Sequence, residues 1–212
     1  DGARATDRQS ADRDASRHLR DREQRVETLQ RLRLDGHAEH RQRRLRRAHA
    51  RQVGGAAGTL LARDVATTSN GIVYTTDGRL VRRSVGGTTT VIAGRGDPAR
   101  GDTGLALEAR LNNPSGLALD AQGNLYIADL GNHRIRRVDA PTRIITTIAG
   151  SGANGYDGDE KPATEASLNN PSGVAAAPNG DIYIADTLNY RVRMIDHATG
   201  FIHTIAGDGV PG

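Results

Sequence analysis

The hexapeptide LNNPSG occurs at residues 111–116 and again, letter for letter, at residues 168–173. The offset of 57 residues extends well beyond these six letters. It relates GNLYIAD at 123–129 to GDIYIAD at 180–186, and TIAG at 147–150 to TIAG at 204–207. A fixed period of this length indicates stacked structural units, as in a solenoid or a propeller.

A weaker copy precedes these two. It reads NGIVYTTDGRLVRRSVGGTTTVIAG at 70–94 and keeps LVRR and IAG, but it is about two residues shorter where the later copies read DLGNHR and DTLNYR. The missing letters include the Asn and the first Arg of that turn. The chain therefore carries two full repeats after a degenerate one.

Each full repeat predicts four short strands. In the first full copy these are SGLALD, LYIAD, RIRRVD and IITTIAG, and the turns AQGN and PNGD of the two copies place Asn and Gly where a hairpin needs positive φ. Four antiparallel strands joined by short turns form one propeller blade. The second strand is apolar on both faces, which suits a sheet between neighbours. In the third strand we expect Ile135 and Val138 to point inward and Arg136 to lie toward the edge.

The stretch NPSGLALDAQGNLYIADLGNHRIRRVD at 113–139 resembles an NHL repeat, and the linker at 155–173 resembles the inter-blade segment of bacterial NHL arrays. The resemblance implies a β-propeller of about six blades, commonly a binding platform. The expected fold is all-β: a partial propeller of four-stranded antiparallel NHL blades with a disordered or loosely helical N-terminal arm. We expect the remaining blades of a longer chain, or self-association, to close the ring.

The expected domains follow from this reading. Residues 1–69 are an Arg-rich low-complexity arm or an artefactual segment, and 70–212 are the propeller segment, with blades at about 70–101, 111–152 and 168–209. Residues 1–52 hold 15 Arg against 9 acidic residues, whereas 53–212 have a net charge of −2. A solvated linker, a nucleic-acid-binding arm and an out-of-frame reading all remain open for 1–52.

The sequence lacks cysteine and long apolar runs, and each absence excludes a class of structure. The chain has no cysteine, which excludes disulfides and thiolate metal sites. No run of about 18 apolar residues is present, so we expect no membrane span, and no signal peptide is visible. The family resemblance favours a location outside the cytoplasm.

A DxxN-x-R pattern is the most prominent candidate site. It comprises Asp129, Asn132, Arg134, Asp186, Asn189 and Arg191. A repeated ligand site is one reading. We favour a structural role, in which the Asp and Asn satisfy a tight turn and the Arg pairs with the carboxylate and bridges to a neighbouring blade.

The linker between the full repeats carries Asp157, Asp159 and Glu160, so calcium is conceivable. We instead expect a Gly-rich turn and one helical turn opened by Pro162. That turn would pack three apolar residues on the adjacent blade: Ala163, Ala166 and Leu168. No metal or cofactor is predicted.

The histidines in the repeats, His133, His197 and His203, form no recognisable catalytic set, so no catalytic residue is assigned and the binding residues stay unknown. The leading prediction is a non-catalytic module of a bacterial protein that presents loops to a protein, peptide or glycan. One alternative is a lyase or hydrolase whose catalytic residues lie in missing blades. RNA binding is a further alternative, which the charge of 53–212 disfavours.

Overall fold

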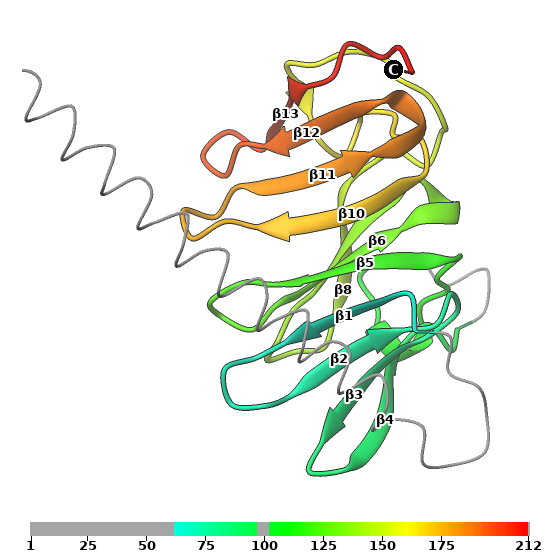
Figure 1. Cartoon of the computed structure of the whole chain (residues 1–212), viewed down its shortest axis with the longest axis vertical. Coiled ribbons are helices and arrows are strands. Elements are labelled where there is room, and N and C mark those ends of the chain that lie inside the picture. Colours follow the sequence, from blue (N-terminus) through cyan, green and yellow to red (C-terminus); the bar gives the residue numbers. More distant parts are fainter. Residues whose placement is uncertain (1–61, 97–101, 212) are drawn as a thin grey trace, which may run out of the picture. The chain divides into compact units, whose positions relative to one another are not determined.

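The structure is a computed structural model that describes residues 62–96 and 102–211. The described residues form three antiparallel sheets, which we call the first, second and third blades (Figure 1). The first contains β1 (Asp64–Thr67), β2 (Val73–Thr76), β3 (Val81–Val85) and β4 (Thr88–Ala93). The second contains β5 (Pro114–Leu119), β6 (Leu125–Asp129), β7 (Arg134–Val138) and β8 (Ile145–Ala149). The third contains β10 (Pro171–Ala176), β11 (Ile182–Asp186), β12 (Arg191–Ile195) and β13 (Phe201–Ala206), with β9 (Lys161–Pro162) added beside β13.

The strand predictions for the two full repeats are confirmed, and in the predicted turns the glycines, Gly123 and Gly180, have positive φ whereas Asn124 and Asn179 do not. Each strand pairs with the next along the chain, as a four-stranded propeller blade requires. The β5–β6 turn has Gly123 at φ 82°, and the Asp120 carboxylate accepts the backbone N–H groups of Gln122 and Asn124 at 3.0 and 2.8 Å. Short 3-10 turns follow the second strands: η2 (Leu130–Asn132) and η3 (Thr187–Asn189).

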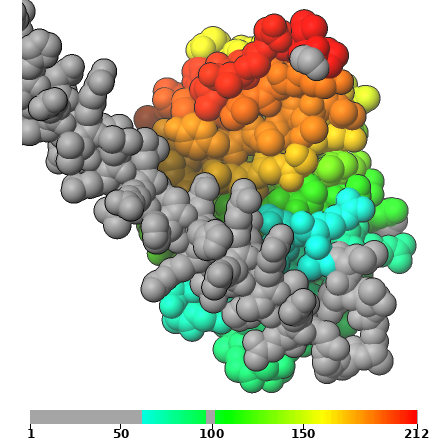
Figure 2. Space-filling model, viewed as in Figure 1, coloured from blue at the N-terminus to red at the C-terminus, as the bar shows by residue number. Residues whose placement is uncertain are grey.

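The blades pack face to face, because neighbouring residues of a strand point to opposite sides of a sheet. Leu125 and Ile127 of β6 lie in the core shared with the first blade, whereas Tyr126 and Ala128 lie in the core shared with the third. The three blades follow one another in chain order in the space-filling view (Figure 2). The chain is therefore a partial β-propeller, as the sequence predicted.

The identical LNNPSG segments lead into β5 and β10, which lie side by side in neighbouring blades. β5 lies beside β10, and a Cβ on Gly116 would stand 2.8 Å from the Cα of Gly173. The Ser115 hydroxyl donates to the carbonyl of Ser172 at 2.9 Å. Glycine is needed here because the two backbones leave no room for a side chain.

Two sequence predictions need correction. The first blade begins at Asp64, ahead of the boundary expected at residue 70. The helical turn expected at Pro162 is wrong, because Lys161 and Pro162 stay extended to pair with β13, and a tight turn follows in which the Glu165 N–H donates to the Pro162 carbonyl at 2.9 Å. In the preceding linker the 3-10 turn η1 (Ala106–Glu108) opens at Ala106, which matches Ala163.

The expected packing of this linker is confirmed. Three residues are buried in the core between the second and third blades: Ala163, Ala166 and Leu168.

The prediction of a disordered or helical arm over residues 1–52 falls outside the described residues. No helix within 62–96 and 102–211 is long and apolar enough to cross a membrane.

Candidate functional site

The repeated Asp forms the same hydrogen bonds in both full copies. Asp129, at the end of β6, accepts the backbone N–H of Asn112 at 2.7 Å, the amide of Asn132 at 2.9 Å and the guanidinium of Arg136 at 3.3 Å. The matching bonds to Asp186 come from the third blade and its linker. Asp186 accepts the backbone N–H of Asn169 at 2.7 Å, the side-chain amide of Asn189 at 2.8 Å and the guanidinium of Arg193 at 3.3 Å.

The arginine that pairs with the carboxylate differs from the one expected. Arg134 donates to the carbonyl of Ser151 at 2.8 Å, and Arg191 donates to that of Asp208 at 2.8 Å, so neither meets the repeated Asp. The ion pairs with Asp129 and Asp186 are formed by the arginines two positions later, Arg136 and Arg193. Arg136 was expected to lie toward the edge of the sheet. Arg136 lies opposite Ile127 in the sheet and is only 4% exposed. The fully buried carboxylate needs that charge beside it.

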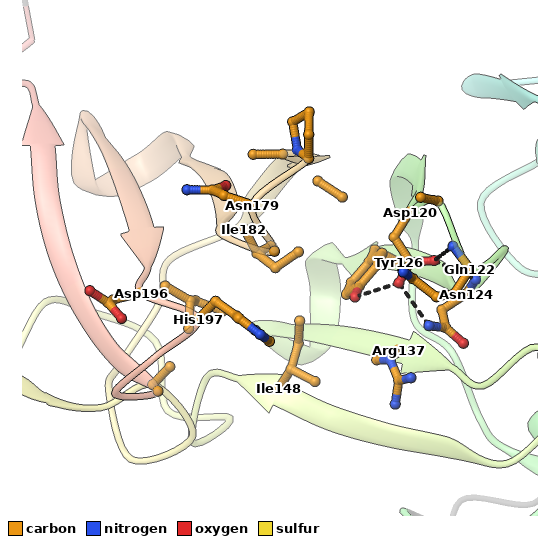
Figure 3. A pocket seen from close by; sticks show the side chains of 18 of the residues that line it. Asp120, Gln122, Asn124, Tyr126, Arg137, Ile148, Asn179, Ile182, Asp196 and His197 are labelled. Carbon is orange, nitrogen blue, oxygen red and sulfur yellow. Dashed lines mark hydrogen bonds between the residues drawn. The ribbon is translucent and has the colours of Figure 1, made fainter.

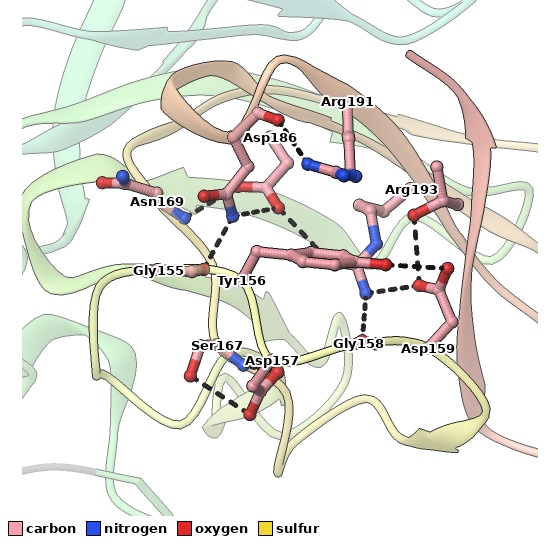
Figure 4. A network of polar contacts seen from close by, with 12 residues as sticks. Gly155, Tyr156, Asp157, Gly158, Asp159, Ser167, Asn169, Asp186, Arg191 and Arg193 are labelled. Atoms are coloured by element: carbon pink, nitrogen blue, oxygen red, sulfur yellow. Dashed lines mark hydrogen bonds and ion pairs between the residues drawn. The ribbon is translucent and has the colours of Figure 1, made fainter. Parts of the chain in front are cut away.

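In the third blade the network continues into the linker (Figure 4). Arg193 donates to the Asp159 carboxylate at 2.7 Å and to the Gly158 carbonyl at 2.9 Å. The ring of Tyr156 lies under two guanidinium groups, with its centroid 3.9 Å from Cζ of Arg191 and 4.9 Å from that of Arg193. These contacts fasten the linker to the blade.

The linker carboxylates considered for calcium have protein partners. Asp159 accepts from Arg193 and Thr204, while Asp157 accepts the Ser167 N–H at 2.9 Å and lies 3.4 Å from Nζ of Lys161. No cluster of three or more His, Asp or Glu side chains suited to a metal ion occurs in the described part of the chain.

The carboxylates of this network differ in their pKa directions. Burial raises the pKa of Asp129 and of Asp186, and the hydrogen bonds and nearby arginine charges oppose that rise without cancelling it. Burial acts in the same direction on Asp159, but hydrogen bonds from Thr204 and the charge of Arg193 outweigh it, so the pKa of Asp159 is lowered.

A cleft of about 740 Å³ lies between the second and third blades, at the end of the sheets that carries the β5–β6 turn. One wall gathers Asp120, Asn124 and Tyr126 (Figure 3). The Asp120 Oδ2 accepts the Tyr126 hydroxyl at 3.0 Å and the Asn124 amide at 2.7 Å. Burial, followed by the hydrogen bond to Asp120, raises the pKa of Tyr126.

The rest of the cleft combines apolar and polar groups. The apolar lining includes Ile148, Ile182 and Ile195, and the polar lining includes Arg137, Asn179, Asp196 and His197. None of these residues was assigned to a site from the sequence. The histidines were expected to form no catalytic set; in the structure His133 accepts the Asn170 N–H, and His203 Nδ1 lies 2.8 Å from Oε1 of Glu160.

A signal for the cleft was nevertheless present in the sequence. At the 57-residue offset, Asp120 corresponds to Ala177 and Arg137 to Met194. The second and third blades have the same order of four strands, although these two positions carry polar residues in one blade and apolar residues in the other. The fold therefore does not require these polar side chains, in contrast to the repeated Asp and its partners.

Comparison with known proteins identifies the repeat. The family model of the NHL repeat matches residues 111–138, and that of the teneurin NHL domain matches residues 151–196. This chain contains NHL repeats. The two matched ranges coincide with most of the second NHL blade and with the linker and inner strands of the third.

The relatives that this chain matches are much longer proteins, of which it spans less than a fifth. It is 34% identical to human NHL repeat-containing protein 2 over 134 residues, which cover 60% of this chain and 18% of that protein. It is 31% identical to human teneurin-4 over 112 residues, 47% of this chain and 4% of that protein. A solved protein of unknown function from Bacteroides thetaiotaomicron superposes with a TM-score of 0.51 at 20% identity, covering 62% of this chain and 34% of that one, a likeness of fold.

Proposed function

We propose that this chain is a non-catalytic binding module, and that the cleft between the second and third blades holds a peptide segment of a partner protein. The observation that supports this is the composition of the cleft. Its apolar floor can receive a side chain, and polar groups from both blades surround it. Anchors at protein interfaces occupy such pockets, with polar contacts at the rim. Its volume lies within the usual range of ligand sites, roughly 300–1,000 Å³.

Arg137 is the residue we assign to the ligand. Both oxygens of Asp120 already accept hydrogen bonds, so that carboxylate holds the wall of the cleft together. Arg137 has five N–H donors, and its ion pair with Asp139 is long, at 3.4 Å, and partly exposed. It therefore retains donors for a backbone carbonyl or a carboxylate of the bound peptide.

The test uses a substitution that the third blade already contains. Peptides that bind the wild-type chain are first selected from a random library. Each selected peptide is then titrated into the wild type, into Arg137→Met and into Arg143→Met, which is the control because Arg143 lies on the exposed β7–β8 turn. Met stands at position 194 of the third blade, so we expect R137M to fold normally. We expect R137M to bind about tenfold more weakly, equivalent to about 1.4 kcal/mol, and R143M to match the wild type. Equal binding by R137M would refute the assignment.

The competing functions give different outcomes. Salt-sensitive binding of single-stranded RNA by residues 53–212 would favour the RNA-binding alternative. Selective retention of neutral glycans, without peptide binding, would place a carbohydrate in the cleft. The lyase or hydrolase alternative depends on residues in further blades. If a longer protein that contains this chain turned over a substrate, and R137M abolished that turnover, the cleft would be assigned a catalytic role instead of a binding role.

A further inference from the structure

A second concave site lies at the opposite end of the sheets from the cleft. It has a volume of about 590 Å³ and is lined by the β2–β3 turn, the segment before β5 and the η2 turn. The cleft is lined by residues at the start of β6, near Asn124, whereas the hollow is lined by Leu130, which directly follows the end of β6. The two sites are therefore separate surfaces, and a ligand of the hollow would be independent of one in the cleft.

The hollow is basic and rich in amides. Its cationic groups are Arg79 and Arg110, the imidazole of His133 lies beside them, and its amides are those of Asn112, Asn113 and Asn170. None of the described residues that line it is an Asp or Glu. Among the described contacts, neither arginine side chain has a carboxylate within ion-pair distance, so both guanidinium groups offer donors to the hollow.

His133 adds a further donor. Its Nδ1 accepts the backbone N–H of Asn170 at 3.2 Å. In the neutral imidazole the proton must then be on Nε2, which can donate. The Asn112 amide donates to the Gly131 carbonyl at 3.0 Å, which orients its oxygen as an acceptor for a hydroxyl group.

The third blade shows that the fold does not need these residues. At the 57-residue offset Arg110 becomes Ser167, Gly131 becomes Leu188 and His133 becomes Tyr190. Tyr190 has the same left-handed backbone as His133, with φ of 53° against 54°. Gly131 also keeps the hollow open, because a Cβ there would stand 2.6 Å from the amide of Asn112.

We propose that this hollow binds an acidic sugar. A guanidinium fork matches a carboxylate, and two arginines beside a histidine supply several charge-assisted donors. Asparagine amides can both donate to and accept from sugar hydroxyls. The apolar lining is limited to Leu111, which is buried, and Leu130. A peptide that depends on an apolar anchor would find little contact here.

The test compares an acidic with a neutral trisaccharide by calorimetry. Trigalacturonate and maltotriose are titrated into the wild type, Arg110→Ser, His133→Tyr and Gly131→Leu, each of which introduces the residue of the third blade. We expect trigalacturonate to bind at least about tenfold more tightly than maltotriose, and more weakly at about 0.5 M salt. We expect R110S and H133Y each to weaken it about three- to tenfold, and G131L to abolish it.

A control variant separates this site from the cleft. Arg137→Met leaves the hollow unchanged and should bind trigalacturonate as the wild type does. The proposal is overturned if neither sugar binds, if both bind equally, or if R110S and H133Y keep wild-type affinity. Tighter binding of a tetraglutamate peptide than of trigalacturonate would also overturn it, in favour of an acidic peptide.

Discussion

The buried Asp–Arg pair is the residue-level feature that each full NHL blade repeats. Asp186 and Arg193 are both fully buried, and the arginine reaches from that carboxylate to Asp159 of the linker. A buried ion pair is not in itself strongly stabilising, because desolvation offsets its attraction. Its effect here is to fix the path of the linker, since Arg193 bonds to the linker at two points.

Replacing Arg193 with Met should therefore destabilise the chain substantially. It leaves the buried Asp186 without its counter-charge, and removing one partner of such a pair costs about 3–5 kcal/mol. Urea denaturation followed by circular dichroism measures the change. Arg143→Met, on an exposed turn, should change the free energy of unfolding by less than about 0.5 kcal/mol. A loss below about 1 kcal/mol for R193M would show that the pair does not secure the linker.

Asp159 should give this network a pH dependence. Its pKa is lowered in the folded chain, so its contribution is fully present above the unfolded pKa of 3.8 and is lost as the pH falls through the folded value. We expect Asp159→Asn to cost about 1–2 kcal/mol at pH 7, since Asp159 accepts a bond from a charged donor. The difference from the wild type should shrink below about pH 4. A difference that stays constant down to pH 3 would contradict the lowered pKa.

At the scale of the element, the close approach of β5 and β10 explains why position 116 is a glycine. We expect Gly116→Ala to lower stability by about 2 kcal/mol or more, because the added Cβ would meet the backbone of Gly173 and Ser172, both at 2.8 Å. Gly104→Ala is the matched control, since no heavy atom lies within 4 Å of its Cβ position. Thermal unfolding of the two variants tests this. Similar midpoints would show that β5 and β10 can separate at little cost.

The elements were predictable where local chemistry decides them. Short apolar runs and the Gly- and Asn-containing turns located β5, β6, β7 and β8, and the repeat assigned the matching strands of the third blade. The pairing of Asp129 with Arg136 was missed, because Arg134 and Arg136 share one face of β7 and Arg134 is directly opposite Asp129, yet the Arg134 side chain donates to the Ser151 carbonyl instead. Strand β9 was missed because only the nearby edge of β13 keeps Lys161 extended. The cleft needs two blades to form, so no single motif encodes it.

At the scale of the whole molecule, the outer face of the third blade matches a surface that the second blade buries. Ile135 is fully buried against the third blade, whereas its counterpart, Val192, is 38% exposed. Ile148 packs in the same core, and its counterpart, Ile205, is 48% exposed. The exposed residues have the chemistry of a blade interface, and exposed apolar surfaces of this kind promote association.

We therefore expect the isolated chain to self-associate through the outer face of the third blade. Val192→Asp places a charge on that face and should shift sedimentation toward the monomer, while leaving the thermal midpoint within about 2 °C of the wild type. Ile135→Asp, at the same register in the second blade, should instead unfold the chain, because it buries an unpaired charge. A wild type that sediments as a monomer at about 100 µM, well above typical micromolar affinities, would show that this face does not pair with a second copy.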